Sequence, residues 1–250
     1  MNISVSNLSW IPNDLDVSLD ILKKFNIHHI EGIFTKINNW ENIKDSDIKF
    51  FKKKCSQRNI QVSSFQSIFY QTSITSFSQY KKVFNHLSLV EKLASKFESK
   101  ILVLGSPTLR KIDSLLNLYK SLKFIDPILQ KNKMIMCIEP NSKIYGGNYF
   151  YSLEEICKFI KDNKFKNIKS MIDTHNLIEE GFDLIDEYVN YIDYIYHVHI
   201  SEKSLDEIKK PKKYRDFIIK LKESYNGLIV YEFKNCKNFE KAIELFINMF

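Results

Sequence analysis

Glycine and arginine are scarce in this chain of 250 residues, which has six glycines and only three arginines. The glycines form neither a G-x-G-x-x-G nor a G-x-x-x-x-G-K-[ST] pattern, so the sequence gives no case for a dinucleotide site or a P-loop. The net charge of +7 comes almost entirely from lysines scattered along the chain. Because recognition of phosphates and bases favours the arginine fork, this composition indicates a solvated lysine-rich surface, and we expect no nucleic-acid partner.

Long apolar runs, a leader and paired cysteines are missing as well. No window approaches the roughly 18 apolar residues of a membrane span, and the first ten residues lack the basic start of a signal peptide. The four cysteines show no C-x-x-C pairing and no histidines at zinc-finger spacing, so we expect reduced thiols. The sequence thus predicts a soluble, cytoplasmic protein without a membrane partner. It leaves the oligomeric state open, a homo-oligomer included.

Strand-like and helix-like segments alternate along the chain, mostly about 25 to 40 residues apart, which is the length of a βα unit. No linker rich in proline, glycine or serine divides the chain, so we expect a single domain over residues 1–250. Eight such units predict an α/β fold, a (β/α)8 TIM barrel, with an open doubly wound sheet as the alternative. The expected strands are 3–8, 28–34, 60–70, 100–104, 134–138, 168–172, 196–202 and 228–233. The expected helices are about 16–25, 45–55, 77–97, 112–129 and 239–250, with others after capping boxes at Ser152 and Ser204 and after Gly181.

Acidic residues end three of the later strands, and a histidine lies near the end of a fourth. In a barrel of parallel strands the carboxyl ends meet at one mouth, where active sites are built. Each acid taken alone has an ordinary structural explanation as a helix cap or ion-pair partner, and each histidine as a hydrogen-bonded core residue. Four such residues on consecutive strands instead predict a site for one divalent ion, Mn²⁺, Mg²⁺, Co²⁺ or Zn²⁺. The predicted ligands are Glu139, Asp173, His199 and Glu232.

These residues carry a resemblance over essentially the whole chain. Ile138-Glu139-Pro140, Ile172-Asp173-Thr174, the segment from His197 to Glu202, and Tyr231-Glu232 resemble the metal set of the xylose isomerase-like TIM barrels. Within that superfamily, the chain is similar to the sugar phosphate isomerase/epimerase group, which includes enzymes of the D-tagatose 3-epimerase type. The resemblance implies that Glu139 and Glu232 are also the catalytic acid/base pair.

Weaker matches and one loop supply the expected substrate contacts. The chain departs from the epimerases in two places: His175 follows Asp173 by two positions instead of three, and Leu205 stands where they carry an arginine. Tyr145 belongs to a loop that either lines the pocket or is an ordinary long connection. The expected substrate-binding residues are Trp10, Glu31, Gln66, Tyr145, His175 and Glu202.

Together these features predict a metal-dependent isomerase or epimerase of a sugar, sugar phosphate or related ketone, acting by proton transfer through an enediolate. The alternatives are a dehydratase of an inositol-like ketone, a barrel that binds sugar without turnover, and an endonuclease IV-like enzyme that cuts DNA at abasic sites. The three-zinc cluster of such nucleases needs more histidines than this chain offers, since Gln66 and Pro107 stand at the ends of the third and fourth strands.

Overall fold

The computed structural model describes residues 2–10, 14–112, 114–234 and 236–250. Strands β1 to β8 run parallel and pair in chain order, and β1 also pairs with β8, so that Ile3 lies opposite Ile229. This closure confirms the predicted TIM barrel, because an open doubly wound sheet would leave its edge strands unpaired. The strands are β1 (Asn2–Ser6), β2 (His29–Gly32), β3 (Gln61–Phe65), β4 (Ile101–Leu104), β5 (Ile135–Ile138), β6 (Ile168–Asp173), β7 (Ile195–Ser201) and β8 (Leu228–Glu232).

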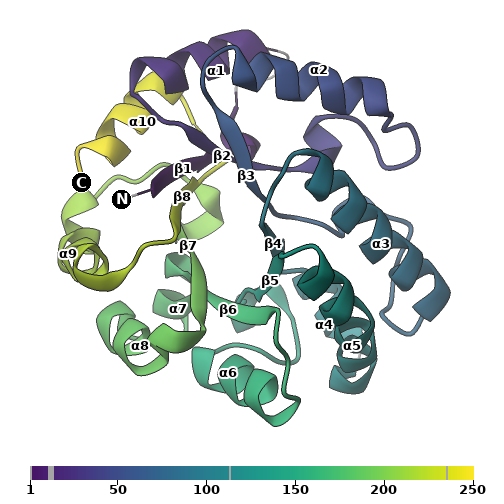
Figure 1. The fold of residues 1–250 in the computed structure, drawn as a ribbon. Coiled ribbons are helices and arrows are strands. Elements are labelled where there is room, and N and C mark those ends of the chain that lie inside the picture. The colour runs from purple at the N-terminus through teal and green to yellow at the C-terminus, as the bar shows by residue number, and fades with distance from the viewer. Residues whose placement is uncertain (1, 11–13, 113, 235) are drawn as a thin grey trace.

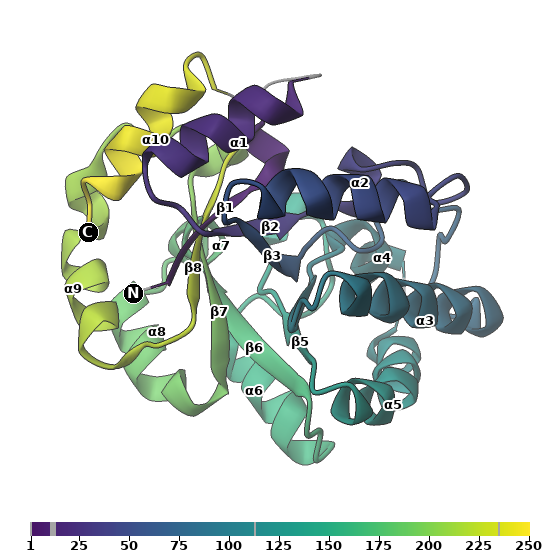
Figure 2. The same cartoon turned by 45° about the horizontal axis from the view of Figure 1, so that its top comes forward.

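Helices surround the barrel as an outer ring (Figures 1 and 2), and the helix α10 near the C-terminus lies beside α1. The α-helices are α1 (Leu15–Lys24), α2 (Asp45–Ser56), α3 (Tyr80–Lys96), α4 (Pro107–Ile112), α5 (Leu115–Lys131), α6 (Leu153–Asp162), α7 (Thr174–Glu179), α8 (Leu184–Tyr191), α9 (Arg215–Ser224) and α10 (Phe239–Ile247). Short 3-10 turns are η1 (Asn7–Ser9), η2 (Phe34–Lys36), η3 (Lys143–Tyr145), η4 (Ile192–Tyr194), η5 (Lys203–Leu205) and η6 (Pro211–Tyr214).

The helix start predicted from the capping-box pattern at Ser152 is confirmed, because Ser152 is the N-cap of α6, but the box is only half formed. The Ser152 side chain accepts a hydrogen bond from the backbone N–H of Glu155, and the Glu155 carboxylate in turn accepts from the backbone of Phe150 and Tyr151. Because these bonds satisfy amides that the helix itself leaves free, the end of the loop after β5 is held in place.

The capping box predicted at Ser204 was wrong. Ser204 and Leu205 have φ of 59° and 55°, so the backbone adopts left-handed conformations that an α-helix cannot include, and only the turn η5 forms. Helix α5 runs past Pro127 to Lys131, beyond the predicted end. Proline removes one helical hydrogen bond, and the burial of Ile125 and Leu129 on either side of it keeps the helix packed.

Apolar side chains fill two layers, one outside and one inside the barrel. The outer layer lies between strands and helices and contains most of the buried hydrophobic residues. The inner cluster is small and consists of Val103, Cys137 and Met171, with Ile101 and Ile135 beside them. Since side chains alternate along a strand, the position two residues beyond Cys137 faces the same interior, and that position is Glu139. The inner apolar cluster therefore lies below the polar site.

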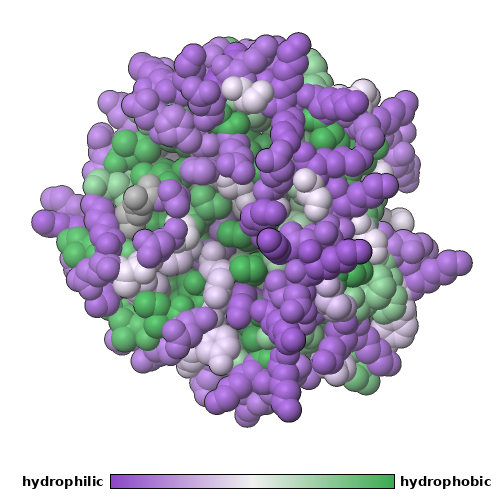
Figure 3. All heavy atoms as spheres, in the orientation of Figure 1, coloured by the Kyte–Doolittle hydropathy of each residue, from purple (hydrophilic) through white to green (hydrophobic). Residues whose placement is uncertain are grey.

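Hydrophilic side chains cover most of the face shown in Figure 3 and are distributed over several elements. Within the described ranges, no helix combines the length and the apolar character needed to cross a bilayer. The cysteines are free thiols, and three of them are buried.

We predict that Gly32→Ala lowers the free energy of unfolding by about 1–3 kcal/mol, the usual effect of overpacking. A Cβ atom at Gly32 would lie 2.4 Å from the ring of Phe65, which cannot retreat because it stacks on Phe34 at 3.9 Å. Gly147→Ala is the matched control, since its Cβ would meet nothing closer than 3.6 Å. Urea unfolding of both variants checks this, and equal stabilities would contradict it.

Candidate metal centre

The four residues predicted as metal ligands come together at the carboxyl ends of β5 to β8. Asp173 on β6 is the direct register partner of His199 on β7. The Nδ1 atom of His199 lies 3.5 Å from a carboxylate oxygen of Glu139, 4.0 Å from Asp173 and 3.2 Å from Glu232. One ligand atom from each of the four side chains lies within 4.8 Å of the others, so the group could hold a metal ion.

Glu139 is positioned by contacts between the ends of β4 and β5. Its backbone N–H donates to the carbonyl of Leu104 at 3.1 Å. The buried guanidinium of Arg110 donates to the carbonyls of both residues, at 2.9 Å to Glu139 and 2.8 Å to Leu104. The side-chain amide of Asn141 donates to the Glu139 carboxylate at 3.0 Å. The sequence assigned no role to Arg110 or to the Asn141 side chain. Pairing of β4 with β5 brings Arg110 to the Glu139 backbone, whereas Asn141 follows Glu139 by two residues and folds back onto its carboxylate.

Asp173 combines its place in the cluster with a structural task. One of its carboxylate oxygens accepts from the backbone N–H of Asn176 at 2.7 Å and caps α7, and the other accepts from the hydroxyl of Ser201 at 2.8 Å. Its side chain is 3% exposed, compared with 13% for Glu139 and 8% for Glu232. The two glutamates are therefore the acids of the cluster that have more access to the cavity.

Glu31 lies beneath the cluster, inside the barrel. Its carboxylate is 2.7 Å from Nε2 of His197 and 2.9 Å from Nε2 of His199, and it accepts a hydrogen bond from Ser64 at 2.8 Å. The register of β2 against β3 shifts at Ile30/Glu31, a type of irregularity that redirects side chains near sites. Glu31 was expected to contact the substrate. Its placement does not fit that prediction, because its side chain is fully buried below the mouth.

Contact with Glu31 defines which nitrogen of His199 faces the cluster. With Nε2 directed to Glu31, Nδ1 is the atom that faces Glu139, Asp173 and Glu232. When one ring nitrogen of a histidine binds a metal, a carboxylate beside the other nitrogen fixes the tautomer and the orientation of the ring. Glu31, His197 and His199 also lie close enough to form a second metal group. Since the Glu31 carboxylate is already engaged by Ser64 and His197, a supporting role explains this lower group.

The charges of the site depend on one another. Burial opposes ionisation of Glu31, but attraction to the two imidazoles outweighs it and lowers the pKa of Glu31. Burial likewise opposes a charged His199, but the carboxylates of Glu31 and Glu232 raise its pKa well above the usual value. Burial and repulsion from Glu139 and Glu232 raise the pKa of Asp173 to about 8. The protein itself thus supplies too little positive charge to balance the three crowded carboxylates.

The donor set fits a divalent cation. Among the described residues, neither ring nitrogen of His199 has a partner in hydrogen-bond geometry, although Nε2 lies 2.9 Å from Glu31 and Nδ1 lies 3.2 Å from Glu232. Three carboxylates and one imidazole form a mainly hard, oxygen-rich set of the kind that binds Mg²⁺, Mn²⁺ or Zn²⁺. A cation there would offset the repulsion that raises the pKa of Asp173.

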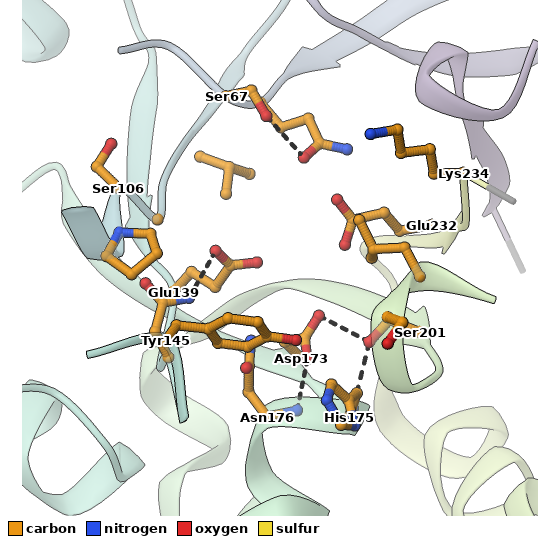
Figure 4. A pocket seen from close by; sticks show the side chains of 17 residues that line it. Ser67, Ser106, Glu139, Tyr145, Asp173, His175, Asn176, Ser201, Glu232 and Lys234 are labelled. Carbon is orange, nitrogen blue, oxygen red and sulfur yellow. Dashed lines mark hydrogen bonds between the residues drawn. The ribbon is translucent and has the colours of Figure 1, made fainter. Parts of the chain in front are cut away.

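A cavity of about 400 Å³ opens above the cluster (Figure 4). The predicted substrate contacts Gln66, Tyr145 and His175 line it, and the ring of Tyr145 lies edge-on to that of His175 with centroids 6.3 Å apart. Nε2 of His175 and Oδ1 of Asn141 are buried and, among the described residues, have no hydrogen-bond partner. Burial lowers the pKa of His175, so its ring is neutral near pH 7. These two atoms are therefore available to a polar ligand.

Two other predicted substrate residues lie away from this cavity. Trp10 stacks on Phe51 at 5.9 Å and lines separate hollows near α1 and α2. Glu202 pairs with Lys213 at 3.2 Å in a neighbouring depression. Trp10 follows the turn η1, and Glu202 follows the last residue of β7. The backbone has therefore left the barrel interior at both positions.

Residues 19–248 match the family model described as xylose isomerase-like TIM barrel. The chain belongs to this family. The match confirms the resemblance that the strand-end motifs predicted, and most of the xylose isomerase-like barrel, from α1 to α10, lies within the matched range. No curated protein sequence matches the chain.

Solved structures with this barrel include enzymes of several kinds. A 3-keto-D-glucoside 4-epimerase from E. coli has a TM-score of 0.79 at 13% identity, with 100% of both chains covered. D-psicose 3-epimerase from Clostridium cellulolyticum H10, solved with D-tagatose, has a TM-score of 0.75 at 13% identity, covering 98% of this chain and 90% of the other. A family 2 AP endonuclease from Brucella melitensis has a TM-score of 0.76 at 13% identity, with 99% of both chains covered, and a probable 3-DHS dehydratase also matches. At such identities the likeness establishes the fold alone.

We predict that Gly105→Ala weakens Mn²⁺ binding by about tenfold or more without unfolding the protein. A Cβ atom at Gly105 would lie 2.2 Å from Oε2 of Glu139, and this flexible carboxylate would move away at little cost to stability. Displacing the partner of a metal ligand usually weakens affinity by about 10- to 100-fold, and displacing the ligand itself has at least that effect. Calorimetric Mn²⁺ titration with circular dichroism tests the prediction, and Gly147→Ala is the control. Wild-type affinity in Gly105→Ala would remove Glu139 from the ligand set.

A second prediction concerns Glu31. Glu31→Gln should lower the free energy of unfolding of the metal-free protein by about 3–5 kcal/mol, because it removes one charge of a buried ionic group and places an NH2 donor against one of the two imidazoles. Glu91→Gln is the matched control, since Glu91 is buried and, among the described residues, accepts from the neutral groups of Ser95 and Asn132. Denaturant unfolding in EDTA measures both. The prediction is contradicted if the two variants lose equal stability.

Proposed function

We propose that this protein is a divalent-metal-dependent isomerase or epimerase of a sugar, sugar phosphate or related ketone. The main support for the proposal is that the three acids differ in how far their carboxylate oxygens are already engaged in hydrogen bonds within the protein. Asp173 has both oxygens engaged by Asn176 and Ser201, whereas Glu139 and Glu232 come from β5 and β8 and reach the cavity from different sides (Figure 4). Two accessible carboxylates beside one substrate space are the requirement for removing a proton and returning it.

Glu139, Asp173, Glu232 and Nδ1 of His199 would hold the metal ion. When bound, a divalent ion supplies Lewis acidity, which polarises a carbonyl and a neighbouring hydroxyl. Glu31 holds the His199 ring through Nε2, and Asn141 orients the carboxylate of Glu139. Supporting contacts of this kind keep catalytic groups within the narrow range of productive positions.

The residues of the chain then perform a proton transfer. One of the two glutamates takes the proton from the carbon next to the substrate carbonyl, which forms an enediolate, and the other gives a proton back. The neutral ring of His175 and the side-chain oxygen of Asn141 are placed to hydrogen-bond substrate hydroxyls. Tyr145 contributes an aromatic surface at the cavity wall. Return of the proton to the opposite face of the same carbon gives an epimer. If the proton came from the terminal carbon, its return to the former carbonyl carbon, with transfer of the hydroxyl proton from one oxygen to the other, gives an aldose.

The solved structures support a carbohydrate substrate without deciding it. Two of those reported above are named as epimerases of sugars or sugar derivatives, but an AP endonuclease and a probable dehydratase share the same barrel. Because one fold carries several reactions, the arrangement of the side chains at the barrel mouth is the stronger support for this function.

Solvent exchange tests the mechanism without knowledge of the natural substrate. In heavy water with Mn²⁺ and a panel of ketoses and ketose phosphates, we expect NMR to show deuterium at a carbon next to the carbonyl. Glu232→Gln should slow this exchange by about 10²- to 10⁴-fold, the usual effect of losing a general base, because the amide keeps an oxygen but cannot take the proton.

Glu223→Gln is the control for this experiment, since it removes the same charge from the exposed surface of α9. Wild-type exchange rates in Glu232→Gln would exclude that residue from the acid/base role. Interconversion without solvent label would indicate a shielded proton or a hydride shift. Efficient incision of an abasic DNA duplex by the wild type would favour the nuclease alternative.

A further inference from the structure

The cavity wall carries one positive side chain among three acids. Of the described residues that line the cavity, Lys234 alone is a lysine or arginine, whereas Glu139, Asp173 and Glu232 are carboxylates. Figure 4 shows the Lys234 side chain extending into the pocket from the side opposite Tyr145 and His175. The cationic group is thus separated from the aromatic wall by the space that a substrate would occupy.

The position of Lys234 follows from the end of β8. Side chains alternate along an extended chain, so Glu232 and Lys234 share the inner side while Phe233 between them points outward. Phe233 is fully buried and stacks on Tyr231 and Phe239 in the outer layer. The backbone N–H of Lys234 donates to the carbonyl of Leu205 at 2.8 Å. These contacts hold the Lys234 backbone beside the cavity.

Lys234 does not serve to neutralise the acids of the site. Within the described ranges, no carboxylate oxygen lies within 4.0 Å of its ammonium group, although three carboxylates line the same cavity. The neighbouring rim lysines Lys209 and Lys213, in contrast, pair with Asp206 and Glu202. Lys234 is an exposed residue that lines the cavity, so its ammonium group remains available to a ligand there.

We propose that Lys234 selects substrates that carry an anionic group, a phosphate or a carboxylate, at the end of the molecule remote from the reacting carbons. This inference rests on the proposed function and narrows its substrate class. Three carboxylates at the cavity floor repel an anion, so a negatively charged substrate needs a cation placed away from them. Lys234 supplies that charge at the rim and orients the substrate with its uncharged carbonyl end toward Glu139 and Glu232.

Binding of three matched ketoses tests the proposal directly. D-fructose is neutral, D-fructose 6-phosphate carries a phosphate and D-fructuronate a carboxylate, and each is titrated calorimetrically into the protein in Mn²⁺-containing buffer. We expect at least one anionic probe to bind about 10- to 100-fold more tightly than D-fructose, as one charge-assisted contact allows. The probe that gains identifies the source of the charge.

Variants at Lys234 separate this contact from direct binding of the anion to the metal. Lys234→Met should abolish the preference for the anionic probe, Lys234→Arg should retain most of it, and Lys209→Met is the control because it removes the same charge from the rim outside the cavity. The proposal is overturned if neither anionic probe binds better than D-fructose, or if Lys234→Met keeps the wild-type preference. Solvent exchange is recorded separately, so absence of exchange with every ketose refutes the proposed reaction, while the binding preference reports on Lys234 alone.

Discussion

The imidazole of His199 lies between one carboxylate below it and three at the mouth, and the arrangement of the site depends on it. Its Nε2 is 2.9 Å from Glu31 in the closed interior, and its Nδ1 faces Glu139, Asp173 and Glu232 at the mouth. A carboxylate in the barrel interior is tolerated only when it is paired and hydrogen-bonded, and Glu31 meets this condition through two imidazoles and Ser64. The orientation of the His199 ring is thereby fixed from below, before any ligand is present.

The interior of this barrel holds an apolar group and a polar group below the mouth. Barrels of this class are commonly filled by layers of branched apolar side chains. Here Val103, Cys137 and Met171 form the apolar group, and Glu31 with its partners forms a polar layer, in which His197 is the register partner of Met171. The polar layer is stable only when each of its charges has a partner. Positional accuracy at the mouth therefore depends on a complete set of contacts one layer below it.

The three acids at the mouth have the same chemistry but different neighbours. Asp173 caps α7 and binds the hydroxyl of Ser201, so it is held rigidly and has little access to the cavity. Glu139 is held through Asn141 and the backbone contacts of Arg110, and its carboxylate has space only because residue 105 is glycine. Differences in accessibility among like groups support the roles proposed for them, and these differences arise from both near and distant residues of the sequence.

The barrel and the strand-end residues could be predicted from the order of apolar and polar residues in the chain. The strand-like and helix-like segments repeat often enough to count eight units. Glu139 and Glu232 each follow a run of residues too apolar to lie on the surface, which indicates a specific role for the acid at its end. Closure of the barrel decided which side chains from distant strands lie next to one another. Glu31 on β2 meets His197 and His199 on β7 only because β1 pairs with β8, and Trp10 and Glu202 leave the interior only because the chain turns outward just before each of them. Local patterns record whether a residue is buried and on which face, because these depend on near neighbours, whereas partners across the barrel are separated by many residues and follow from the closed geometry.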